Sequence, residues 1–214
     1  MKTRKKINYS VRIFLGVFLL AIGALAFFNA FYYNNSPIIF WFCYLCVPLA
    51  GLGILINNPT IVKSQLYILA IPDLIWVTDF FYFLINGHSL LGIVDYLFKA
   101  GDFLPKLVTM QHLIAIPIMF YSLVILKNKD RSAWKISLIQ VTIVYFITRI
   151  FTAPQTNVNC VYDMCGNISL NLGGGIYPLI WFIGMFLMIY ISREMFIKLH
   201  RMFGGLFERI RQIG

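Results

Sequence analysis

An apolar run over residues 64–85 contains three residues that membrane-spanning helices rarely hold. The run reads SQLYILAIPDLIWVTDFFYFLI and includes Pro72, Asp73 and Asp79. A helix that crosses the hydrocarbon core of a bilayer needs about 20 apolar residues, and a carboxylate at its centre costs on the order of 3 kcal/mol. We therefore expect this run to span a membrane and its two carboxylates to serve a polar site.

The composition supports a membrane protein of the all-α class. Hydrophobic residues make up 60% of the 214 residues, the mean hydropathy is +0.79, and 12% of the residues are charged. Soluble domains carry about 25% charged residues. We predict one polytopic helix bundle with membrane lipids as partners.

Six spans are predicted, and together they form a membrane domain over residues 1–191. The first is longer than a signal-peptide core and is interpreted as a retained span, with a cleaved signal peptide as the alternative. The predicted spans are residues 13–33, 38–56, 64–85, 107–126, 134–152 and 176–191.

Two amphipathic stretches lie outside these spans. The sequence LLGIVDYLF between spans three and four predicts a short helix at the outer surface, with four aliphatic residues buried: Leu90, Leu91, Val94 and Leu97. A connector with no further role is the alternative. Residues 192–214 alternate apolar and basic residues at helical spacing, which predicts a tail helix on the inner leaflet.

The basic residues predict the orientation of the chain. The net charge is +10, and 15 of the 18 Lys and Arg residues fall in the N-terminal segment, the 2–3 and 4–5 loops and the tail. Cytoplasmic loops carry the excess of Lys and Arg, so both termini are predicted to be cytoplasmic. Because the basic residues lie in short runs between spans, a nucleic acid partner is not expected.

Three ionisable residues are predicted at one depth in the outer third of the membrane. Asp79, His112 and Arg149 lie three to six residues from the outer ends of their predicted spans, which places them within a layer about 5 Å thick. Asp73 lies about 9 Å deeper. Because intramembrane ionisable groups are functional candidates, we predict that these four residues form a catalytic site.

Five polar residues near this level are candidate substrate ligands: Asp95, Thr109, Gln111, Asn157 and Asn159. The structural alternative is that Asp79 pairs with Arg149 to lock spans three and five together, while His112 bonds a neighbouring carbonyl group.

Three functions are compatible with such a site. The first is an enzyme acting on a lipid or lipid-linked substrate, with His112 as general acid or base, Asp79 orienting it, and water or Thr109 as nucleophile. The second is a proton- or cation-coupled carrier using Asp73 and Asp79, which with six spans is expected to act as a homodimer. The third is an assembly partner whose polar groups serve helix packing.

The cysteines support a fourth hypothesis. Cys160 and Cys165 lie in an outer loop without basic residues and predict a disulfide. Cys43 and Cys46 in span two are expected to be packing residues. Together the two pairs resemble the layout of the quinone-linked thiol oxidases of the DsbB type, which implies a thiol-disulfide oxidoreductase. That family has four spans, and no basic residue follows Cys46 here.

A second resemblance covers more of the chain. PDLIWVTDFFYFLINGHSLLGIVDYLF at 72–98, QHL at 111–113 and NVNCVY at 157–162 are similar to stretches of a group of multi-pass bacterial inner-membrane proteins. The resemblance implies an inner-membrane location and no particular activity. Its motif positions match six residues: Asp73, Asp79, Asp95, His112, Asn157 and Asn159.

Metal and nucleotide motifs are missing from the sequence. The chain has no HExxH pattern, and its histidines at 88, 112 and 200 are dispersed. The glycines at 173–175 lack the Lys-Ser/Thr of a phosphate loop. We expect neither a metal nor another cofactor.

Overall fold

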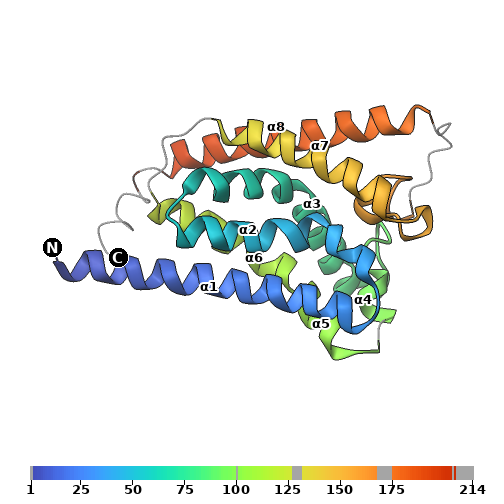
Figure 1. The fold of residues 1–214 in the computed structure, drawn as a ribbon, viewed down its shortest axis with the longest axis horizontal. Coiled ribbons are helices and arrows are strands. Elements are labelled where there is room, and N and C mark those ends of the chain that lie inside the picture. Colours follow the sequence, from blue (N-terminus) through green and yellow to red (C-terminus); the bar gives the residue numbers. More distant parts are fainter. Residues whose placement is uncertain (1, 100, 127–131, 168–174, 204, 206–214) are drawn as a thin grey trace.

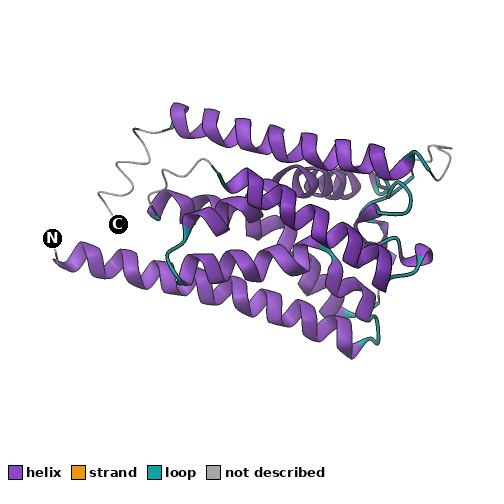
Figure 2. Ribbon diagram, turned by 45° about the horizontal axis from the view of Figure 1, so that its top comes forward, coloured by secondary structure: helices purple, strands orange, loops and turns teal. Residues whose placement is uncertain are grey.

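The protein is an all-α bundle, as predicted. The computed structural model describes residues 2–99, 101–126, 132–167, 175–203 and 205, and within these ranges Figure 2 shows helices and loops without strands. The helices are α1 (Lys2–Tyr32), α2 (Phe42–Leu55), α3 (Pro59–Asn86), α4 (Asp95–Lys99), α5 (Phe103–Thr109), α6 (Gln111–Ile125), α7 (Ala133–Phe151) and α8 (Tyr177–Met202), with 3-10 turns η1 (Ser36–Phe40), η2 (Pro154–Thr156) and η3 (Val158–Cys160).

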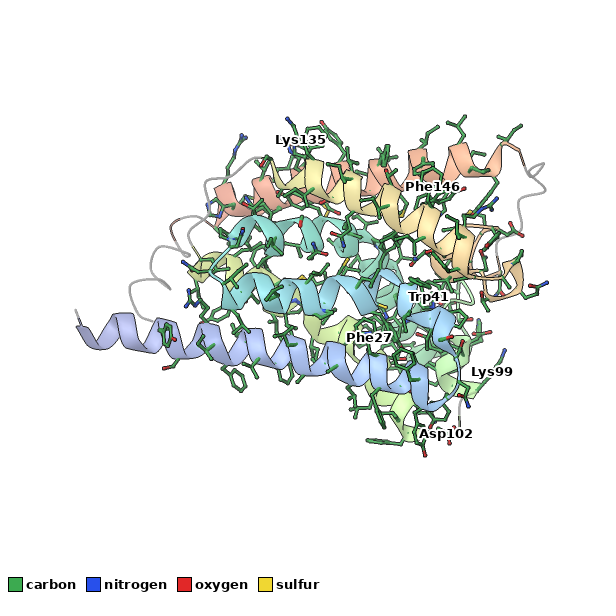
Figure 3. The ribbon with its side chains drawn as sticks, in the orientation of Figure 1. Phe27, Trp41, Lys99, Asp102, Lys135 and Phe146 are labelled. Atoms are coloured by element: carbon green, nitrogen blue, oxygen red, sulfur yellow. A yellow bond between two sulfur atoms is a disulfide. The ribbon has the colours of Figure 1, made fainter. Side chains whose placement is uncertain are left out.

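The helices identify a multi-pass membrane protein. Within the described ranges, five helical segments are long and apolar enough to cross a bilayer: Tyr9–Tyr32, Pro59–Asn86, Phe103–Ile125, Ala133–Phe151 and Tyr177–Met202. Large apolar side chains such as Phe14, Phe146 and Ile183 are more than half exposed, and Figure 3 labels Phe146 beside α7 and α8. Such surfaces suit contact with lipid.

Two predicted spans differ from the observed helices. Helix α2 has 14 residues, which corresponds to about 21 Å of rise, because η1 and the turn at Trp41 replace its predicted first residues. The predicted span 107–126 begins earlier, at Phe103, and is interrupted at Met110 between α5 and α6.

The long helices run along one axis in a layered arrangement. In Figure 1, α7 and α8 lie on one side, α2, α3 and α6 lie in the middle, and α1 covers the opposite flank. The start of α1 and the end of α8 lie at the same end of the bundle. We call the other end, which holds η1, α4 and residues 152–166, the loop end.

Glycines allow α1 and α2 to pack closely. A Cβ atom on Gly51 would lie 2.8 Å from the backbone oxygen of Gly16, and one on Gly23 would lie 2.6 Å from Pro48. Small residues at such positions let membrane helices approach backbone to backbone. The contact between α1 and α2 therefore depends on positions that accept no side chain.

A polar cluster joins α3 to α7 inside the bundle. Gln65 and Gln140 exchange two amide hydrogen bonds of 2.9 and 2.8 Å, and the Gln140 amide also donates to the Cys46 sulfur at 3.4 Å. The Ser137 hydroxyl donates to the backbone oxygen of Ser64 at 2.9 Å. Because these groups satisfy one another, we interpret the cluster as helix packing.

The two predicted amphipathic stretches have different outcomes. In the first, Val94 and Leu97 are buried, whereas Leu90 is 54% exposed, because residues 88–94 wrap around the end of α3 and helix α4 begins at Asp95. In the second, residues up to Met202 continue α8. Residue 204 and residues 206–214 lie outside the described ranges.

Candidate functional site

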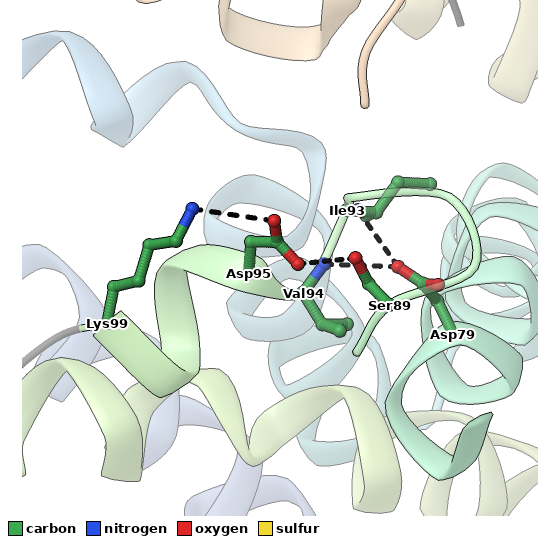
Figure 4. Close-up of polar contacts among 6 residues, drawn as sticks. All are labelled: Asp79, Ser89, Ile93, Val94, Asp95 and Lys99. Atoms are coloured by element: carbon green, nitrogen blue, oxygen red, sulfur yellow. Dashed lines mark hydrogen bonds and ion pairs between the residues drawn. The ribbon is translucent and has the colours of Figure 1, made fainter. Parts of the chain in front are cut away.

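Asp79 is a structural cap at the loop end. Its Oδ1 accepts the backbone N–H groups of Leu90 and Leu91, both at 2.8 Å. Its Oδ2 accepts those of Ile93 at 2.9 Å and Val94 at 3.2 Å, as the latter two show in Figure 4. The carboxylate is fully buried, and charge-assisted bonds to backbone donors offset its desolvation.

Arg149 also has partners other than those predicted. Its guanidinium donates to the backbone oxygen of Val161 at 3.1 Å and lies over the Tyr162 ring at 4.6 Å. Within the described ranges no ion pair joins it to Asp79. The predicted meeting of Asp79, His112 and Arg149, and the alternative lock between Asp79 and Arg149, are therefore both wrong.

The two predicted asparagine ligands organise the 152–166 loop. The Asn157 side chain accepts the backbone N–H groups of Tyr162 and Asp163 and donates to the Asp163 oxygen. Asn159 is buried and ties the loop to the start of α2, because its side chain accepts the Phe42 N–H at 2.9 Å and donates to the Phe40 oxygen at 2.7 Å. The Cys160–Cys165 disulfide is present in this loop.

His112 pairs with Asp73 within the membrane-spanning helices. The distance from His112 Nδ1 to Asp73 Oδ1 is 2.8 Å, so Asp73 on α3, and not Asp79, orients the imidazole on α6. The Asp73 side chain is 5% exposed and the His112 side chain 14%. The imidazole is thus the more accessible member of the pair, and we call the two residues the dyad.

The predicted partner of His112 was Asp79, and the observed partner is Asp73, because the helix ends differ from those predicted. The predicted depths assume uninterrupted helices with known ends, whereas α5 begins at Phe103 and the helix is interrupted at Met110 before α6 starts. Residues 88–94 also fold back and occupy Asp79. Neither feature can be predicted from the periodicity of the local sequence.

The imidazole ring is held between aromatic and polar groups from three other elements. It stacks on Trp76 of α3, with ring centroids 4.7 Å apart and an angle of 22°. The Trp76 indole N–H donates to the Tyr96 hydroxyl of α4 at 3.2 Å, and the Cys43 thiol at the start of α2 also interacts with the His112 side chain. This stacking and pairing fix the ring orientation in advance of any reaction.

Tyr96 brings the loop end over the dyad. About half of its surface is exposed, but its hydroxyl also interacts with Thr109 of α5, and burial of that end raises the pKa of Tyr96 from its ordinary value. A tyrosine phenol carries its proton at neutral pH and can donate a hydrogen bond.

Two predicted ligands adjoin the dyad. Thr109 is buried, and its hydroxyl donates to the Pro105 backbone oxygen at 2.8 Å. Gln111, one residue before His112, is 2% exposed, and its Oε1 has no hydrogen-bond partner among the described residues. A buried acceptor without a partner costs about 1–3 kcal/mol, and it marks a place where a donor from a ligand would be stabilised.

Asp95 lies on the outer side of α4, away from this role. It accepts a hydrogen bond from Ser89 and pairs with Lys99 at 3.5 Å, as Figure 4 shows. The Ser89 hydrogen bond lowers the pKa of Asp95, with a smaller contribution from Lys99. The neighbouring residue Tyr96 is the one that reaches the dyad.

Sequence reasoning missed Trp76, Tyr96 and the placement of Cys43. Trp76 follows Asp73 by three residues, a spacing that puts both on adjacent turns of one helix face, and this signal was available. Helices α2 and α6 are in contact, as are α4 and α5, but the sequence alone does not predict these pairs. Among the described residues no group of three or more His, Cys, Asp or Glu side chains suits a metal ion.

Comparisons with known proteins leave the site to be interpreted from its own geometry. No match to this chain is found among protein-family models, curated proteins or solved structures.

Proposed function

We propose that the protein is a membrane enzyme that transforms a lipid or lipid-linked substrate by general acid–base catalysis at His112. The observation that carries the proposal is the 2.8 Å contact between His112 Nδ1 and Asp73 Oδ1. A carboxylate that accepts the Nδ1 proton fixes the imidazole tautomer and leaves Nε2 free to accept a proton.

The surroundings favour catalysis over helix packing. A packing role requires hydrogen bonds that satisfy both partners, as in the Gln65–Gln140 pair. The dyad instead leaves part of His112 exposed and collects further reactive groups from α2 and α4. Both side chains of the dyad are largely buried, so charges that develop there interact strongly with it.

A substrate dissolved in the membrane suits this position. The dyad lies within helices whose outer faces are apolar. Leu74 directly follows Asp73, Ile114 lies two residues after His112, and both are exposed on those faces. Acyl chains have access to such a surface without leaving the bilayer. We propose a bacterial inner membrane as the location, with both termini cytoplasmic, as the distribution of basic residues favours.

The test is lipid conversion by the purified protein. The full chain is reconstituted in nanodiscs made from a bacterial phospholipid extract, and the lipids are followed by mass spectrometry over time. The wild type is expected to consume at least one lipid class, and His112→Ala to lower that rate by about 10²–10⁴-fold.

His88→Ala is the matched control, because His88 is an exposed histidine on the 87–94 loop. It is expected to retain the wild-type rate. The absence of any lipid change with the wild type, or equal rates for the wild type and His112→Ala, contradicts the proposal.

A further inference from the structure

We infer that Cys43 is the nucleophile of this site and that the substrate is an acyl ester or thioester. The inference rests on the proposed function and deepens it by naming the attacking atom and the bond that is broken. Cys43 is a free cysteine and is 9% exposed. Its side chain interacts with His112, whose imidazole is paired with the Asp73 carboxylate.

The fold presents the Cys43 thiol at the beginning of a helix. Cys43 is the second residue of α2, and α2 packs against both α3 and α6, which carry the dyad. The start of α2 is fixed in place because Phe42 donates its N–H to Asn159 and stacks on Trp181. The thiol is thus held at a set position relative to His112.

The first turn of α2 also offers a backbone donor for an oxyanion. The N–H groups of Tyr44 and Leu45 donate to the Trp41 oxygen, and that of Phe42 donates to Asn159. Cys43 is the second residue of α2, and the first N–H groups of an α-helix have no acceptor within that helix. An N–H beside the attacking sulfur, at the positive end of a helix, stabilises the negative charge of a tetrahedral intermediate.

The reaction balances without a further reagent. His112 Nε2 takes the thiol proton while the sulfur forms a bond to the acyl carbonyl carbon. The bond from that carbon to the leaving oxygen or sulfur breaks, and the leaving group takes the proton from Nε2. Water or an acceptor hydroxyl then attacks the thioester, gives its proton to Nε2, and releases the thiol after the proton returns to sulfur.

The second cysteine of the C-x-x-C sequence serves as a matched control. Cys46 is fully buried one turn further along α2, and its sulfur accepts a hydrogen bond from Gln140. It is placed for packing and lies in the cluster that joins α3 to α7. The two cysteines therefore share a helix and a residue type but differ in their neighbours.

The test uses a long-chain acyl p-nitrophenyl ester as a probe of the full-length protein in nanodiscs. After acid quenching and digestion, mass spectrometry is expected to find one acyl group on the Cys43 peptide, removable by neutral hydroxylamine. Cys46→Ala is expected to keep this adduct, and His112→Ala to slow its formation by about 10²–10⁴-fold. No adduct in the wild type, an adduct at another residue, or a rate unchanged by His112→Ala overturns the inference.

Lipid conversion by Cys43→Ala separates this inference from the proposed function. If Cys43→Ala converts lipid at the wild-type rate while His112→Ala does not, the nucleophile is wrong and the acid–base site stands. If both variants convert lipid at the wild-type rate, both proposals fail. Alkylation of Cys43 by a small apolar maleimide provides a test that needs no cysteine variant. The alkylation rate is compared between the wild type and Asp73→Asn, and the variant is expected to react more slowly. Equal rates count against the inference.

Discussion

Two aspartates on one helix have different roles because of their neighbours. Asp73 and Asp79 are both buried on α3. All the bonds to Asp79 come from backbone N–H groups of a loop, which leave no place for a ligand. Asp73 bonds to a titratable side chain, so its charge can influence a proton transfer. At the scale of single residues, the partner and not the residue type distinguishes a cap from a catalytic candidate.

Asp79→Ala is predicted to destabilise the protein strongly. Four backbone donors lose their acceptor, and each buried donor left without a partner costs about 1–3 kcal/mol. We expect a loss of about 3–5 kcal/mol after partial rehydration of the loop, in the range found when one partner of a buried charged interaction is removed. Thermal unfolding in detergent measures it. Asp95→Ala, which removes an exposed pair with Lys99, is the control, and an equal effect of the two variants contradicts the assigned role.

The sequence predicts the candidate residues of this site better than their contacts. The cost of burying charge singles out Asp73, Asp79 and His112 from composition and depth alone. Their pairing depends on where α5 begins and how residues 88–94 fold back, which are tertiary features. Tyr96 was missed because aromatic residues are common in this chain, with 12 Tyr and 20 Phe, and one more carries little information.

At the scale of elements, glycines determine how closely α1 and α2 pack. Gly51→Leu is predicted to separate these helices, because even the first carbon of a side chain would lie 2.8 Å from the Gly16 oxygen. Overpacking of this kind costs about 1–3 kcal/mol or more. The same substitution at Gly184, where an added Cβ meets no atom within 4 Å, is expected to be tolerated. Equal melting temperatures for the two variants in detergent argue against the close α1–α2 contact.

The Gln65–Gln140 pair is predicted to hold α3 against α7. Gln65→Leu leaves the Gln140 amide without its partner and is expected to destabilise the fold by about 1–2 kcal/mol. Because apolar replacement of both partners removes the unsatisfied group, Gln65→Leu/Gln140→Leu should recover part of the loss. A double-mutant cycle from denaturation in SDS measures the coupling, and strictly additive effects contradict the pairing.

The disulfide of the 152–166 loop is expected to contribute less to the free energy of unfolding than the Asp79 cap does. Removing both cysteines by Cys160→Ser/Cys165→Ser opens a short loop, for which the loss of chain constraint amounts to about 2 kcal/mol. Asn157 and Asn159 retain their bonds to the backbone, so the loop is expected to stay docked at α2. Unfolding with and without a reductant tests this in the wild type. A loss of unfolding free energy larger than that caused by Asp79→Ala contradicts this expectation.

At the scale of the whole molecule, the bundle agrees with the pattern that composition predicts. Among the described residues, six apolar helical segments follow the six predicted runs, although α2 is short and α5 and α6 share one segment. Hydropathy predicts such elements because every helix must satisfy its own backbone in the bilayer. It does not predict 3-10 turns such as η1, whose position depends on contacts with the distant residue Asn159.

Orientation is tested by cysteine accessibility in whole cells. A single introduced cysteine at Lys99, an exposed residue of the loop end, is predicted to react with a membrane-impermeant maleimide added outside. One at Arg201, near the end of α8, is predicted to react only after the cells are opened. The reverse pattern would contradict cytoplasmic termini.

The most direct measurement of the central claim is the lipid-conversion rate of Asp73→Asn compared with that of Asp79→Asn, at a temperature where both remain folded. If His112 acts as an acid–base group oriented by Asp73, then Asp73→Asn falls toward the rate of His112→Ala while folded Asp79→Asn keeps most of the wild-type rate. Loss of conversion in Asp79→Asn, with Asp73→Asn at the wild-type rate, contradicts the assignment.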